Sequence, residues 1–282
     1  MTEDEGPDSC AQWSEKGGVG KTSITTGVAA VAGARGIRVV VIDGDPRATA
    51  TEELGVEVGD GTLTLNDLLY IPESLDAVPV DPAEAVFDVL CPAGPAWPST
   101  VRVIPAERKL ANRESDARPF HGRIRRAVAA LSGHVDLVLI DMPPRPGGNL
   151  VNALIEASKK SLVPASLTTD GFAGVQHVLH SIRVLEAGGA HAPELVGIVR
   201  SQVPRDSERR AIHEHFNSML IEKYGDYLLD VQVREYSIRE EARAASTPIT
   251  AAPGPAARTL AKAYGTVLDC ILAKELTGAA RG

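Results

Sequence analysis

The sequence predicts an α/β protein whose central sheet is mostly parallel and is flanked by helices on both faces. Two observations support this class. Short apolar runs alternate with longer stretches of helical periodicity, which is the pattern of repeated strand–helix–strand units. The composition agrees, because 44% of the 282 residues are hydrophobic and 23% are charged, as in an ordinary globular protein.

Short runs rich in Val, Ile and Leu predict the strands. The run at 37–42 is nearly continuous and apolar, which is typical of a strand covered on both faces. Similar runs follow at 101–104, 135–140, 161–163 and 195–199. Residues 9–14 precede a glycine-rich loop but lack β-branched residues, so the pattern there is poor for a buried central strand. Without that strand the loop would lose its anchor.

Helices are predicted between the strands, at about 20–34, 119–132, 148–158, 171–187 and 206–222. The segment Gly55–Pro98 is rich in Gly, Pro and Asp, which indicates a helical excursion with loops. A final amphipathic helix is expected to begin at Pro253–Pro255 and to pack on the sheet. Right-handed crossovers place the loops after the strands at one edge, where ligands usually bind.

Charge and cysteine content limit the function classes. The formal net charge is −8, but residues 195–282 carry 12 Lys and Arg against 11 Asp and Glu, so the last third can hold a local basic face. Three separated cysteines indicate a reducing compartment without a disulfide framework. No apolar run approaches the ~18 residues of a membrane span. We expect residues 1–9 to be a disordered acidic segment and residues 10–282 to form one domain.

A glycine-rich loop carries the strongest signal for chemistry. Its residues, with the one that follows, are the candidate nucleotide-binding set: Lys16, Gly17, Gly18, Val19, Gly20, Lys21, Thr22 and Ser23. Glycines let the backbone N–H groups turn toward one anion, and a helix that starts near Gly20 adds its positive end. Lys21 places a charge on the outer phosphates, and the Thr22 hydroxyl suits Mg²⁺. The usual first glycine is replaced by Glu15, and a second lysine, Lys16, follows it.

These residues resemble the deviant Walker A motif of the ParA/MinD family of P-loop ATPases. The segment 42–47, IDGDPR, resembles the family's second motif, although Arg47 replaces the usual Gln and either tunes hydrolysis or faces solvent. The segment 139–144, LIDMPP, resembles its Walker B signature. Weaker likenesses lie at 103–106 and 248–249, so the resemblance covers roughly residues 14–275. It implies a single-domain P-loop NTPase of the SIMIBI type, closest to Soj-like ParA proteins.

The resemblance also implies roles for single residues around Mg²⁺ and ATP. Lys21 would contact the phosphates, and Asp45 would orient the attacking water. Thr22 and Asp141 would hold Mg²⁺, with Asp43 supporting the metal shell. Lys16 would cross to the partner's phosphates in an ATP-bound sandwich dimer. The catalytic candidates are therefore Lys16, Lys21 and Asp45, and the metal candidates are Thr22, Asp43 and Asp141.

The favoured function is that of a cytoplasmic, nucleoid-associated partition ATPase. ATP would close a homodimer that binds DNA without sequence preference, and a ParB-like centromere-binding partner would stimulate slow hydrolysis and release. Relatives place basic residues that contact DNA in two regions, which here contain Arg200, Arg205, Arg209 and Arg210, and Arg234, Arg239 and Arg243. Ion pairs with nearby carboxylates would equally explain any one of these arginines. Lys159 and Lys160 are expected to be a solvated pair on a loop.

Three alternatives compete with this function. A MinD-like membrane-cycling ATPase requires a basic amphipathic C-terminal helix, which the tail does not supply. The second alternative is a metabolic or electron-transfer member of the same superfamily; an iron–sulfur relative would need paired bridging cysteines on the switch loops, and near Asp141 the sequence has none. A degenerate nucleotide-binding module with little turnover stays open because the first strand is poor, although both Lys16 and Lys21 argue against it.

Overall fold

The apolar runs assemble into one sheet in the computed structural model, which describes residues 6–72, 78–116 and 120–273. Within these residues the strand order is β3-β4-β2-β5-β1-β6-β7-β8. The strands are β1 (Asp8–Gln12), β2 (Val39–Asp43), β3 (Cys91–Pro92), β4 (Val101–Ile104), β5 (Leu137–Asp141), β6 (Lys160–Ala165), β7 (Glu194–Val203) and β8 (Leu228–Arg234). All neighbours are parallel except β3 and β4, which confirms the mostly parallel sheet.

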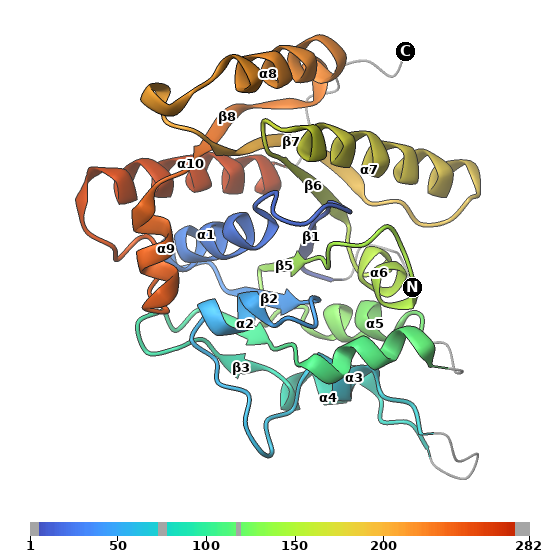
Figure 1. The fold of residues 1–282 in the computed structure, drawn as a ribbon. Helices are drawn as coiled ribbons and strands as arrows, with labels where there is room; N and C mark the ends of the chain where they lie inside the picture. The colour runs from blue at the N-terminus through green and yellow to red at the C-terminus, as the bar shows by residue number, and fades with distance from the viewer. Residues whose placement is uncertain (1–5, 73–77, 117–119, 274–282) are drawn as a thin grey trace.

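Helices cover both faces of this sheet. They are α1 (Lys21–Ala34), α2 (Thr49–Glu53), α3 (Leu65–Leu69), α4 (Pro82–Asp88), α5 (Arg123–Ala130), α6 (Asn149–Glu156), α7 (Thr169–Ala187), α8 (Ala211–Tyr224), α9 (Ser237–Ala244) and α10 (Gly254–Leu272). Short 3-10 turns lie at η1 (Arg108–Ser115), η2 (Asp206–Glu208) and η3 (Gly225–Tyr227). Figure 1 shows α1 and α10 side by side against the sheet.

Successive strand residues alternate between two cores. In β2, Val39 and Val41 join the core formed with α1 and α10, whereas Val40 and Ile42 join the core formed with α5, α6 and α7. This alternation follows from the two-residue period of a strand, and burial on both faces explains why the sequence runs are continuously apolar.

The strand before the glycine-rich loop forms although it has no β-branched residues. β1 lies between β5 and β6, and residues 9–12 are buried. Its polar side chain Gln12 is satisfied, because the Thr25 hydroxyl donates to the Gln12 amide oxygen over 3.0 Å. Pairing on both sides therefore outweighs the low strand propensity, and the loop keeps its anchor.

β1 begins at Asp8, so residues 8 and 9 belong to the sheet and not to the expected disordered segment. Residues 1–5 of that segment lie outside the described part of the chain, as do residues 274–282.

Lys159 and Lys160 are not the solvated loop pair that was expected. Lys160 is 9% exposed and lies in β6. Its Nζ donates to the carbonyl of Ile271 over 2.6 Å and to that of Ala273 over 3.2 Å, at the end of α10. Lys159 Nζ donates to the carbonyl of Gly6 over 2.7 Å. The lysine in β6 thus caps the negative end of a helix distant in sequence.

The segment Gly55–Pro98 contains α3 and α4 with loops, as the composition indicated, and also the short edge strand β3, which was not predicted. The expected helix at 206–222 begins later, at Ala211, because η2 precedes it. Within the described residues no helix is both long and apolar enough to cross a membrane. Cys10, Cys91 and Cys270 are all free thiols.

Candidate functional site

The glycine-rich loop connects β1 to α1 at the carboxyl edge of the sheet. Gly18 and Gly20 have φ angles of 72° and 85°, in the left-handed region where a side chain would strain the backbone. No side chain caps α1 at Gly20, so the first N–H groups of the helix stay available to an anion. The loop is therefore a cradle for a negatively charged group.

Both lysines of the loop have defined positions. Lys21 is 7% exposed, and its Nζ donates to the Lys16 carbonyl over 2.8 Å. Burial lowers the pKa of Lys21, while the charges of Asp141 and Asp45 oppose that shift. Lys16 Nζ lies 3.2 Å from Asp170 Oδ1, and the two side chains are 37% and 71% exposed. Lys21 thus stays beside the loop, whereas Lys16 is held by a weak ion pair within its own chain.

Two neighbouring elements hold the loop in place. The Ser201 hydroxyl of β7 donates to the Val19 carbonyl over 2.6 Å. On the other side, Glu15 Oε2 lies 3.1 Å from His177 Nδ1 of α7. A Cβ at Gly174 of α7 would lie only 2.8 Å from the Ser14 hydroxyl, so α7 needs glycine there to approach the loop. Glu15, which replaces the usual glycine, therefore fastens the loop to α7.

The proposed metal ligands Thr22 and Asp141 lie together. The Thr22 hydroxyl donates to Asp141 Oδ2 over 2.6 Å, and the Thr25 hydroxyl oxygen, whose proton is directed to Gln12, lies 3.2 Å from Oδ1. Burial, with the nearby Asp43 charge, raises the pKa of Asp141 to about 8. A buried carboxylate beside a hydroxyl offers the hard oxygen ligands that Mg²⁺ prefers. The residues present therefore fit a magnesium ion.

Asp43 and Asp45 belong to the turn that links β2 to α2. Asp43 is fully buried, and Oδ2 accepts from the Thr51 N–H and hydroxyl over 2.8 and 2.7 Å. Its Oδ1 accepts from the Asp45 N–H over 3.1 Å. Burial raises the pKa of Asp43 to about 6. Because both oxygens are held within the turn, Asp43 can support a metal shell only indirectly.

Asp45 is half-buried and more loosely held. Its Oδ1 accepts from the Arg47 N–H over 3.0 Å, and its carbonyl accepts from the Ala48 N–H over 2.8 Å. Ala48 has a φ of 57°, which is unusual for a residue with a side chain. Arg47 was expected either to tune hydrolysis or to face solvent. Its side chain is exposed, which agrees with the second of these roles.

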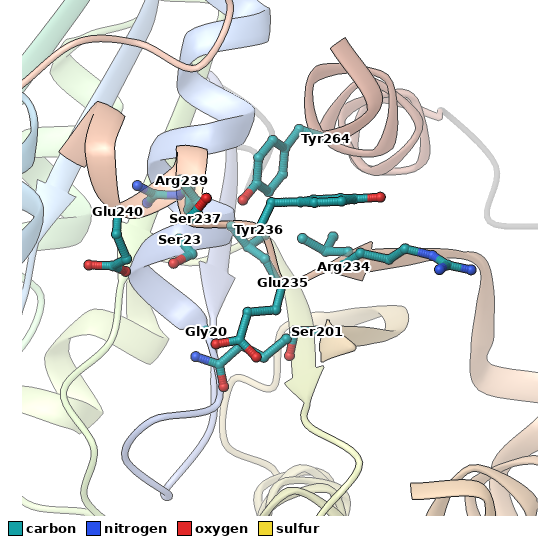
Figure 2. A pocket seen from close by; sticks show the side chains of 13 residues that line it. Gly20, Ser23, Ser201, Arg234, Glu235, Tyr236, Ser237, Arg239, Glu240 and Tyr264 are labelled. Atoms are coloured by element: carbon teal, nitrogen blue, oxygen red, sulfur yellow. The ribbon is translucent and has the colours of Figure 1, made fainter. Parts of the chain in front are cut away.

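A hollow that is partly open to solvent lies beside the loop, and we call it the lateral pocket. It is lined by Gly20, Ser23, Ile24, Ser201, Gln202, Val233, Arg234, Glu235, Tyr236, Ser237, Arg239, Glu240 and Tyr264. In Figure 2, Glu235 extends toward Gly20 and Ser201, while Arg234 points away from the hollow. A second hollow, also open to solvent, is lined by Gly17 and Gly18.

Sequence reasoning missed most of the lateral pocket, including Gln202, Glu235, Tyr236 and Tyr264. Gln202 has a φ of 49°, an uncommon conformation that often marks a ligand-binding edge. The available signal was positional, because Gln202 is the second-to-last residue of β7 and Glu235 directly follows β8, and these two parallel strands end at the loop's edge of the sheet. No motif in the sequence distinguishes them.

The seven predicted DNA-binding arginines do not share one environment. Arg239 is 9% exposed and pairs with Glu53, so it cannot reach DNA and that prediction is wrong. Arg200 is half-buried and donates to Asn217 over 3.2 Å. Four others form ion pairs: Arg205 with Glu208, Arg209 with Glu214, Arg234 with Asp206, and Arg243 with Glu240. Arg210 is exposed and has no ion-pair partner among the described residues.

Comparisons with known proteins agree with this geometry. A family profile described as an AAA domain matches residues 10–191. Sporulation initiation inhibitor protein Soj from Bacillus subtilis (strain 168) is 30% identical over 175 residues, covering 61% of this chain and 63% of Soj. Chromosome partitioning protein ParA from Myxococcus xanthus is 28% identical over 200 residues, covering 71% of this chain and 66% of that protein. The matched segments thus span slightly less than two-thirds of these two relatives.

The fold has solved counterparts. The ATP complex of a McdA variant from Cyanothece superposes with a TM-score of 0.79 at 20% identity, covering 97% of this chain and all of that chain. At this identity the likeness concerns the fold alone. It extends over the whole sheet and the helices on both of its faces.

Proposed function

The chain belongs to the ParA/MinD family of deviant Walker A P-loop ATPases, and on that premise we propose that it is a partition ATPase. In the proposed cycle, Mg·ATP closes a sandwich homodimer, the dimer binds DNA without sequence preference, and a ParB-like partner stimulates slow hydrolysis and release. The observation that carries this proposal is the cradle at the start of α1, where Lys21 and the Thr22–Asp141 pair surround one anion-binding loop.

The nucleotide would bind with its phosphates on the loop. The N–H groups at Gly18 to Thr22 and the buried ammonium of Lys21 would hold the phosphoryl oxygens, and low exposure strengthens that attraction. The nucleoside would enter the lateral pocket, which adjoins the loop at Gly20 and Ser23. A pocket that starts at the phosphate cradle and runs toward α10 suits a nucleoside triphosphate better than a free anion.

Mg²⁺ would be held by the Thr22 hydroxyl and the Asp141 carboxylate, where it supplies positive charge to the terminal phosphates. Asp45 would accept a hydrogen bond from the attacking water and orient it. Asp45 suits this role because its charge acts on Lys21 while its side chain is less firmly engaged than that of Asp43.

Lys16 would act between two subunits. Its ion pair with Asp170 is exposed to solvent, so the ammonium can leave it at low cost. Once it has left Asp170, the Lys16 ammonium would contact the phosphates of the nucleotide bound to the partner subunit. Dimerisation would then depend on whether ATP is bound. The second hollow, over Gly17 and Gly18, lies at this face of the loop.

For DNA, we propose Arg205, Arg209, Arg210, Arg234 and Arg243, because Arg200 is half-buried and Arg239 is buried. All of these except Arg210 are paired with carboxylates, so each would have to exchange its carboxylate partner for a DNA phosphate. Arg210 needs no such exchange. We therefore expect weak, salt-sensitive DNA binding that depends on the doubled surface of the dimer.

The deciding experiment measures retention of non-specific duplex DNA with ATP, with ADP and without nucleotide. Retention is expected only with Mg·ATP, and Lys21→Ala should abolish it together with ATP binding. The double variant Arg205→Ala/Arg243→Ala and the single variant Arg210→Ala should each reduce retention and leave ATP binding intact. Arg38→Lys, which alters an exposed pair with Asp136 far from this face, is the matched control. Equal retention in all three nucleotide states would contradict the partition mechanism.

A further inference from the structure

Arg239, a residue that DNA binding cannot use, lies at the floor of the lateral pocket. It belongs to α9, and its side chain is 11% exposed. Figure 2 shows it close to Ser237 and to the left of Tyr264, whereas the Glu235 side chain extends away from it toward Gly20. A buried guanidinium is costly unless its partners satisfy it, so the surroundings of Arg239 indicate its role.

Three helices meet at this guanidinium. Arg239 Nη2 pairs with Glu53 of α2 and donates to the Thr26 hydroxyl of α1 over 2.9 Å. The Thr26 hydroxyl also lies 2.5 Å from Glu53 Oε1. The Glu53 side chain is only 5% exposed, and Arg239 is its only ion-pair partner among the described residues. The cluster thus ties α9, at the pocket, to α2.

Among the described residues, two polar atoms on this side of the pocket have no hydrogen-bond partner other than each other's side chain. They are Nε of Arg239 and the hydroxyl of Tyr264, a residue that is fully buried on α10. Both residues line the lateral pocket. Buried polar groups are normally satisfied, and two unsatisfied donors at one pocket floor match a ligand that brings hydrogen-bond acceptors.

α2 in turn positions the turn that contains Asp45. Thr51 of α2 binds Asp43 Oδ2 through its N–H and its hydroxyl. The residue before α2, Ala48, is held in a left-handed conformation and donates to the Asp45 carbonyl. A shift of this five-residue helix would therefore displace the Asp43–Ala48 turn.

We propose that Arg239 is a positioning residue that couples occupation of the lateral pocket by a nucleoside to the placement of α2, and through α2 to Asp45. The inference rests on the proposed nucleotide binding and adds a link that no sequence motif carries. Arg239 Nε and the Tyr264 hydroxyl donate to acceptor atoms of the nucleoside, while Arg239 Nη2 stays paired with the Glu53 carboxylate. Occupation of the pocket then fixes α9, and the ion pair fixes α2.

Two variants test this link without leaving an unpaired buried charge. Arg239→Lys keeps the charge for Glu53 but removes the Nε donor. The double variant Arg239→Met/Glu53→Met removes both charges at similar volume, a replacement that buried ion pairs often tolerate. Arg38→Lys is the control. Circular dichroism and thermal unfolding establish that each variant is folded.

The probes are Mg·ATP and inorganic tripolyphosphate, titrated by calorimetry, together with phosphate release at saturating ATP. Both variants should bind Mg·ATP about tenfold more weakly, as expected for one lost hydrogen bond to a charged donor, and tripolyphosphate unchanged. The rate at saturating ATP should fall several-fold in the double variant and be partly restored in Arg239→Lys, because only the lysine retains the tie to α2.

An equal loss of affinity for both probes would show that Arg239 only supports the fold, and would overturn the inference. An unchanged affinity for Mg·ATP, or an unchanged rate at saturation in the double variant, would overturn it as well. If the unaltered protein bound neither probe, the proposed function itself would fail. The two failures are therefore distinguishable.

Discussion

At the level of single residues, the aspartates near the loop differ in how firmly they are held. The Asp141 carboxylate accepts from the Thr22 hydroxyl, and that of Asp43 accepts from the N–H groups of Asp45 and Thr51 and from the Thr51 hydroxyl, whereas the Arg47 N–H is the one donor to the Asp45 side chain among the described residues. A firmly held carboxylate suits a fixed metal position, and a freer one suits the orientation of a water molecule. This difference supports the separate roles that we propose for side chains of the same type.

Replacing Asp45 by Ala should therefore separate binding from turnover. We expect Mg·ATP affinity within about threefold of the unaltered protein and a loss of at least about 100-fold in turnover, since general-base and water-orienting groups contribute factors of this size. Calorimetry and phosphate release measure the two quantities. Hydrolysis by the variant at the unaltered rate would contradict the role of Asp45.

The raised pKa of Asp141 predicts a pH dependence of stability in the protein without metal or nucleotide. Burial raises this pKa from 3.8 to about 8, so between these values the folded protein keeps a proton that the unfolded chain has released. The stability linked to that proton is present below pH 4 and is lost as the pH rises through 8.

Asp141→Asn removes this titration, because the amide stays neutral. From pH 5 to pH 8 the variant should gain about 1–3 kcal/mol in unfolding free energy relative to the unaltered protein. Urea unfolding in EDTA provides the measurement. Parallel stability profiles for the two proteins would count against a buried, protonated Asp141.

At the level of elements, α1 is the central support of the site. It carries the loop at one end and packs against α10 along its length. Gly27 makes this approach possible, because a Cβ there would overlap the ring of Tyr264. Tyr264 also forms the floor of the lateral pocket, so helix packing and pocket shape depend on the same contact.

Gly27→Ala should therefore destabilise the protein by about 1–3 kcal/mol through overpacking, and should also weaken Mg·ATP binding. The control is Gly59→Ala, since Gly59 has no atom within 4 Å of an added Cβ. Denaturant unfolding compares the two variants. Equal unfolding free energies for Gly27→Ala and Gly59→Ala would mean that α1 and α10 can move apart to admit a methyl group without loss of stability.

At the level of the whole molecule, Lys16 is the residue whose proposed role needs two chains. Within one chain its ammonium pairs with Asp170 across an exposed contact. Lys16→Ala should leave Mg·ATP affinity within about threefold, because removing an exposed pair changes little, but should prevent the ATP-dependent dimer. Light scattering with and without Mg·ATP tests this. A dimer formed by the variant would contradict the proposed trans contact.

Much of the architecture could be predicted because its signals are local. The apolar runs indicated the buried strands, and the glycines with Lys21 and Thr22 indicated an anion-binding turn, since backbone freedom and side-chain chemistry are set by neighbouring residues. β1 was underestimated because its stability comes from pairing with β5 and β6 and not from its own residues.

The surroundings of charged residues could not be predicted in the same way. Arg210 and Arg239 look alike in the sequence, yet one is exposed and the other is buried against Glu53, which lies 186 positions earlier in the chain. Lys160 looked like a loop residue, yet it caps α10. Each outcome depends on which distant element packs against the side chain.

The sequence by itself thus determined the sheet class, the anion-binding loop and the types of side chain around it, because these follow from spacing and composition over a few residues. Only the tertiary structure decided which charges face solvent, that Lys16 has Asp170 as an alternative partner, and that a pocket ending at Arg239 and Tyr264 adjoins the loop. Burial and pairing are properties of elements that meet in space, so they arise only when the chain has folded.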